Sequence, residues 1–70
     1  MIQSTAIVHP KARIGEKAMI WHWVQIREEA EIGEGTIISK GVYIDFGVKI
    51  GRNVKIQNNV SVYHGVTIED

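Results

Sequence analysis

Every sixth residue of this 70-residue chain is isoleucine or valine, from Ile2 to Ile68 without interruption. Two positions before each of these residues, from Ala6 onward, stands alanine, valine or threonine. Side chains alternate across a strand, so the two positions share one face and the residues beside them point outward. From Gly35 onward the third residue after each aliphatic one is glycine or asparagine, which tolerate a positive φ at a turn. The pattern predicts short strands separated by tight turns.

The composition agrees with strands rather than helices. The chain has 12 isoleucines and 8 valines and no leucine, and β-branched side chains favour strands. Gly15, Gly33 and Gly51 are spaced 18 residues apart, which indicates three strands in each coil. We therefore expect an all-β solenoid of about four triangular coils, forming a single domain over residues 1–70. There is no cysteine to form a disulfide or a Cys-x-x-Cys site.

Charge and hydropathy narrow the possible partners. Eight basic and eight acidic residues cancel, which argues against a nucleic-acid or anionic-membrane surface. No apolar run approaches the roughly 20 residues of a membrane span, and the segment from Met1 to Thr5 lacks the layout of a signal peptide. These features predict no nucleic-acid or membrane partner and a cytoplasmic location.

The hexad resembles that of the hexapeptide-repeat acyltransferases, and this resemblance implies a single-stranded left-handed parallel β-helix. Two segments are similar to bacterial N-acetyltransferases that act on UDP-linked 3-amino sugars. They are residues 20–26, IWHWVQI, and residues 54–70, VKIQNNVSVYHGVTIED. Chains of that family continue past the second segment through further coils and an asparagine associated with catalysis. The resemblance therefore implies that the 70 residues correspond to an N-terminal portion of such an enzyme.

The resemblance implies acetyl transfer from acetyl-CoA, as co-substrate, to the amino group of a nucleotide-linked amino sugar in surface-polysaccharide synthesis. It also implies a homotrimer and a UDP-amino sugar as partner. The alternative is a truncated or engineered β-helix scaffold or assembly module without catalytic activity. An ice-binding solenoid is disfavoured because Thr5, Thr36 and Thr67 do not stack at intervals of 18 residues.

Polar residues near the end of the chain are the candidate substrate contacts: Gln57, Asn58, Tyr63 and His64. The side chains of Gln57 and Asn58 can hydrogen-bond a sugar or nucleotide, whereas Asn59 falls in the turn column. His64 is the weak candidate for a catalytic residue, because imidazole suits a general base near neutral pH. The competing interpretation of His64 is a solvated turn residue.

Outward-facing apolar residues indicate an oligomer interface. Met19, Trp21 and Ile37 are expected to be neighbours on one face, with Trp23 close by, and an exposed patch of this kind normally marks an interface. The only histidines are His9, His22 and His64. His9 and His64 are expected three coils apart, about 14 Å, too far to share a zinc ion, so we predict no metal site.

Overall fold

The computed structural model describes all of residues 1–70 as two-residue strands joined by four-residue turns. Nothing in it offers a helix of the length and apolarity that a membrane span requires. The strands are β1 (Ile7–Val8), β2 (Arg13–Ile14), β3 (Met19–Ile20), β4 (Gln25–Ile26), β5 (Glu31–Ile32), β6 (Ile37–Ile38), β7 (Tyr43–Ile44), β8 (Lys49–Ile50), β9 (Lys55–Ile56), β10 (Ser61–Val62) and β11 (Thr67–Ile68).

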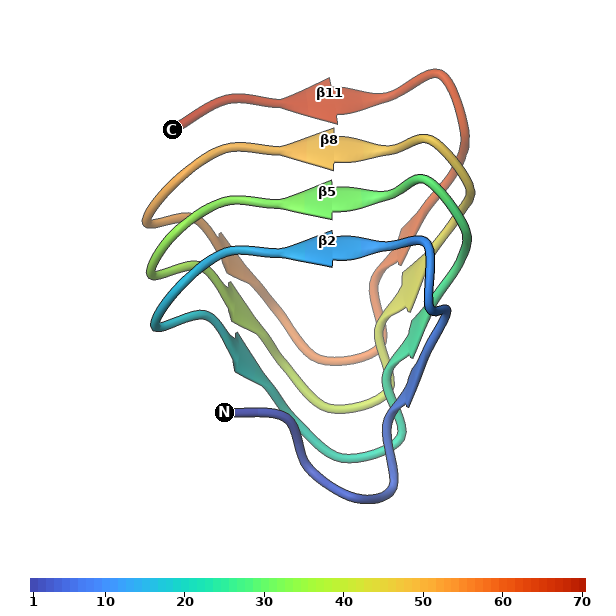
Figure 1. Cartoon of the computed structure of the whole chain (residues 1–70), viewed down its shortest axis with the longest axis vertical. Helices are drawn as coiled ribbons and strands as arrows, with labels where there is room; N and C mark the ends of the chain where they lie inside the picture. Colours follow the sequence, from blue (N-terminus) through green and yellow to red (C-terminus); the bar gives the residue numbers. More distant parts are fainter.

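The strands stack into three parallel sheets that form the sides of a triangular prism. The strand orders are β1-β4-β7-β10, β2-β5-β8-β11 and β3-β6-β9. Paired residues are 18 apart, as in Ile26 with Ile44, so each coil lies directly on the preceding one. Figure 1 shows β2, β5, β8 and β11 one above another, with the chain passing through the other two sides between them. The predicted left-handed parallel β-helix is confirmed, with between three and four coils.

The hexad aliphatic residues fill the inside of the prism. Ile20, Ile26, Ile38 and Ile44 are at most 1% exposed. Their burial supplies the main stabilisation, about 1.5–3 kcal/mol for each side chain. The terminal coils lack a neighbour on one side, and there Ile2 is 50% exposed.

Thr36 is the polar member of the inward columns, and the fold satisfies its hydroxyl. The Thr36 Oγ1 atom donates to the Gly51 carbonyl at 2.6 Å and accepts from the Val54 amide at 3.1 Å. A threonine is therefore tolerated at a fully buried position, because neither the hydroxyl nor the amide is left without a partner.

The predicted turn column has positive φ at every Gly and Asn position from Gly35 to Gly65. The same backbone conformation occurs earlier in the column at Lys17, Trp23 and Glu29, with φ of 62°, 63° and 62°. Side chains that ordinarily avoid this region adopt it here because the three-sided coil requires the same turn at each corner. The coil geometry thus overrides the local preference of the residue.

Candidate active site

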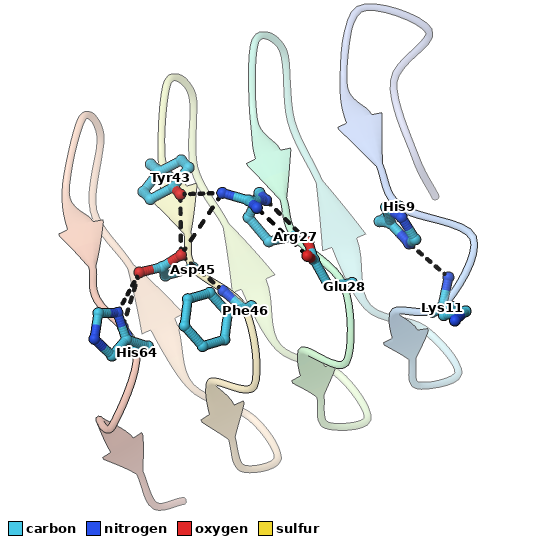
Figure 2. A network of polar contacts seen from close by, with 8 residues as sticks. All are labelled: His9, Lys11, Arg27, Glu28, Tyr43, Asp45, Phe46 and His64. Atoms are coloured by element: carbon cyan, nitrogen blue, oxygen red, sulfur yellow. Dashed lines mark hydrogen bonds and ion pairs between the residues drawn. The ribbon is translucent and has the colours of Figure 1, made fainter.

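A polar network lies at the corner that follows β7 and β10 (Figure 2). Asp45 directly follows β7, and His64 is the second residue after β10. Phe46 occupies the place in its coil that His64 occupies in the next, since the two are 18 residues apart. Their rings stack with centroids 4.7 Å apart and planes 11° apart. This stacking fixes the plane of the imidazole.

The Asp45 carboxylate is the centre of the network. Its Oδ2 atom lies 2.9 Å from Nδ1 of His64 and accepts from the His64 amide at 3.1 Å. Its Oδ1 atom accepts from the Phe46 amide at 2.9 Å and from the Tyr43 hydroxyl at 3.0 Å. Asp45 is only 6% exposed, although its place in the hexad predicts an outward, solvated side chain. The four donors compensate the carboxylate for the water it has lost.

Arg27 extends the network down to the preceding coil. Its Nη1 atom donates to the Tyr43 hydroxyl at 3.1 Å and lies 3.9 Å from Oδ1 of Asp45. Its Nε atom donates to Oε1 of Glu28 at 3.0 Å. Hydrogen bonds to Glu28 and then to Tyr43 raise the pKa of Arg27 above its ordinary value. Tyr43 therefore accepts from a fixed cation and donates to Asp45.

These contacts keep Asp45 ionised. The hydrogen bond from the His64 side chain is the largest cause, followed among the stabilising contacts by the amides of Phe46 and His64 and the Tyr43 hydroxyl. Together they outweigh burial and hold the pKa of Asp45 well below its usual range. Asp45 is thus a carboxylate, with a negative charge facing the imidazole.

The lowered pKa of Asp45 predicts a specific loss of stability in acid. A carboxylate whose folded-state pKa is depressed stabilises the fold above its unfolded pKa of 3.8, and this stabilisation is lost as pH falls toward the folded value. Thermal unfolding should therefore show a Tm that falls more steeply below about pH 4 in the wild type than in Asp45→Asn. Parallel Tm curves for the two proteins below that pH would contradict the ionised, hydrogen-bonded Asp45.

The geometry gives His64 a defined tautomer. An ionised carboxylate only accepts hydrogen bonds, so Nδ1 of His64 carries the proton in that contact. In the neutral ring the lone pair is then on Nε2, which makes no hydrogen bond, and the side chain is 63% exposed. A carboxylate that orients an imidazole in this way makes the outer nitrogen a proton acceptor. The arrangement is that of a general base with its positioning residue.

The family follows from comparison with known proteins. The model of the bacterial transferase hexapeptide (six repeats) matches residues 11–45. The chain belongs to this family. The sequence matches no curated protein significantly.

A solved structure shares the fold over almost the whole chain. It is that of Arabidopsis UDP-N-acetylglucosamine acyltransferase, with a TM-score of 0.91 and 20% sequence identity over 99% of this chain. The match covers 25% of that structure, so the hexapeptide chain described here spans about a quarter of its length. The similarity extends to the coil geometry.

The predicted substrate contacts lie at two different corners. Tyr63 and His64 follow β10, where Tyr63 packs on Tyr43 with ring centroids 6.4 Å apart. Gln57 and Asn58 follow β9, at the corner before. The structure therefore brings His64 to Asp45, and β10 separates this pair from Asn58.

Asp45, Tyr43 and Arg27 were missed as site residues by reasoning from the sequence. The signal that could have found Asp45 is the 18-residue register, which places residue 63 above it and His64 beside it. The donation from Arg27 to Tyr43 depends on side-chain conformations that the repeat does not determine.

The predicted interface residues also separate into two groups. Met19 and Ile37 are paired in register between β3 and β6, and with Trp21 they line a groove of about 420 Å³ on that face. Trp23 lies outside the groove and is 67% exposed at its corner. No group of three or more His, Cys, Asp or Glu side chains is arranged to hold a metal ion.

Proposed function

We propose that this hexapeptide-family chain is an N-acetyltransferase domain in which His64 is the general base. The donor is acetyl-CoA and the acceptor is the amino group of a nucleotide-linked amino sugar. The observation that carries the proposal is the Asp45–His64 pair, with Nδ1 held at 2.9 Å by the carboxylate and Nε2 open to solvent. The proposal includes a cytoplasmic location, where acetyl-CoA and nucleotide sugars are available.

The reaction needs a base and a donor for the oxyanion. The acceptor amine attacks the thioester carbonyl, a C–N bond forms, and Nε2 of His64 takes the proton that the amine loses. Collapse of the tetrahedral intermediate breaks the C–S bond, and the imidazolium returns a proton to the leaving thiolate. The Gly65 amide directly follows His64 and makes no hydrogen bond within the protein, so it is the donor we assign to the oxyanion.

Substrate identity is supported by resemblance rather than by a bound molecule. Segments 20–26 and 54–70 resemble transferases of UDP-linked 3-amino sugars, and the protein of similar fold is named for UDP-N-acetylglucosamine. Tyr63 is 62% exposed beside His64 and can contact the sugar. Gln57 and Asn58, exposed at the preceding corner, are the proposed contacts to the nucleotide.

Product formation tests the proposal directly. The chain is incubated with acetyl-CoA and a UDP-linked 3-amino sugar, and N-acetylated product is detected by mass spectrometry. UDP-N-acetylglucosamine, which has no free amine, is the matched control and should remain unchanged. Absence of acetylated amino sugar at every enzyme concentration would contradict catalysis and favour the scaffold.

A homotrimer is the second part of the proposal. The apolar strip formed by Met19, Trp21, Trp23 and Ile37 would be hydrated in a monomer, and the 67% exposed Trp23 is its most prominent member. Burial of this strip between copies would remove apolar area from water.

Trp23→Glu should reduce the oligomeric mass to that of a monomer, because a charge would be buried in the interface. Glu29 already adopts φ of 62° at the equivalent corner, so glutamate fits the backbone there. Light scattering measures the mass, and Lys17→Glu, at the same turn position but outside the strip, is the control. A wild-type monomer, or a Trp23→Glu trimer, would contradict this interface.

A further inference from the structure

The face of β3, β6 and β9 carries a groove that the Asp45–His64 site does not use. Its cavity volume is about 420 Å³, within the range of small-molecule sites. Met19, Ile37 and Lys55 follow one another up the face in register. Trp21 lies along the same groove and is half-buried. The apolar side chains and the indole provide a surface for a planar ring.

The charged residues of the groove have one sign. Lys40 and Lys55 line it, both are exposed, and neither lies within ion-pair distance of a carboxylate. No acidic side chain lines the groove. His22 and Asn58 add neutral polar atoms at the same corner, and His22 is held through Nδ1 by the Thr5 hydroxyl at 3.0 Å. The groove is therefore suited to an anion.

Ser39 gives an independent indication of a ligand. It is 8% exposed and lines the groove, yet its hydroxyl makes no hydrogen bond within the protein. No fully buried side-chain polar atom lacks a partner, so this hydroxyl opens onto the groove. A polar group that is more than nine-tenths buried ordinarily has a partner, and a bound molecule can supply one here.

We infer that this groove binds a nucleoside diphosphate. The base stacks on Trp21, the phosphates pair with Lys40 and Lys55, and the Ser39 hydroxyl donates to the ligand. The inference rests on the proposed function in one respect: the nucleotide is the carrier of the acceptor sugar. Binding of the nucleotide itself requires neither acetyl-CoA nor His64.

Tryptophan fluorescence can measure this binding with UDP as the probe. Trp23→Phe leaves Trp21 as the only indole, so a saturable change on adding UDP reports the groove. Uridine alone should bind about tenfold or more weakly, because it lacks the charge that pairs with the lysines. Inorganic phosphate alone should leave the emission unchanged, because it has no ring to stack on Trp21.

Substitutions identify the groups that bind. In the Trp23→Phe background, Lys40→Gln and Lys55→Gln should each raise the Kd for UDP about tenfold. Lys49→Gln removes the same charge from the adjacent face and should leave the Kd unchanged. Ser39→Ala should raise the Kd several-fold without lowering Tm, since the hydroxyl has no partner in the protein.

The outcomes separate the groove from the chemistry. Saturable UDP binding that depends on Lys40 and Lys55 supports the inference whether or not acetyl transfer is observed. Absence of UDP binding, or equal binding by the lysine variants, overturns it even if the chain acetylates amino sugars. Loss of acetyl transfer in His64→Ala with unchanged UDP binding supports both assignments.

Discussion

Replacing Asp45 by asparagine should lower the rate of acetyl transfer about 100-fold or more. The amide at position 45 can donate to Nδ1 of His64, which would place the imidazole proton on Nε2, where the acceptor amine needs a lone pair. The substitution keeps the size of the side chain, so the corner and the Phe46–His64 stacking should be retained. Steady-state release of coenzyme A measures the rate.

A readout of the tautomer separates positioning from simple structural support. Nitrogen NMR shifts of the His64 ring should indicate Nδ1–H in the neutral wild type and Nε2–H in Asp45→Asn. His9→Gln is the matched control, because His9 accepts only from the Lys11 amide at 3.0 Å and has no carboxylate partner. An unchanged rate in Asp45→Asn, or an equal loss in His9→Gln, would contradict the role assigned to Asp45.

Gly33→Ala should destabilise the fold by about 3 kcal/mol, because its new methyl group would meet backbone rather than a movable side chain. The added Cβ would overlap the Gly51 carbonyl group and lie 2.7 Å from the Arg52 amide nitrogen. Two coils would have to separate at this corner, and hydrogen bonds between them would lengthen. Urea unfolding monitored by tryptophan fluorescence measures the free energy of unfolding.

The neighbouring residue provides the control for Gly33. Glu34 is exposed, so Glu34→Ala should change the free energy of unfolding by less than about 0.5 kcal/mol. The loss in Gly33→Ala is large for 70 residues, whose total stability is typically about 4–10 kcal/mol. Equal stability of the two variants would mean that the coils are not in the close contact that the structure shows.

The architecture could be predicted from the sequence because one repeat determines it. The hexad defines which residues face inward, and the 18-residue spacing of Gly15, Gly33 and Gly51 defines three sides. In the structure Gly15 approaches the Gly33 backbone as Gly33 approaches Gly51, so the spacing reflects contacts between coils. The left hand came from the family resemblance, since alternation of side chains is the same in either hand.

The candidate site was less predictable because its residues depart from the repeat rule. Asp45 and Ser39 occupy outward positions, yet they are 6% and 8% exposed. Larger neighbours lie beside each of them: Tyr43 and Phe46 beside Asp45, and Trp21 in the groove that Ser39 lines. Burial at these positions depends on side chains in adjacent coils. A rule that assigns each residue by its own place in the hexad does not include such neighbours.

The most direct test of the account is amine-dependent release of coenzyme A by the wild type and by His64→Ala. The chain has no cysteine, so a thiol-reactive dye reports coenzyme A without a protein background. With acetyl-CoA and a UDP-linked 3-amino sugar, we predict release by the wild type that requires the amino sugar. We predict release about 100-fold or more slower in His64→Ala. Equal rates in the two proteins, or no amine-dependent release by the wild type, would contradict His64 as the base of an acetyl transfer.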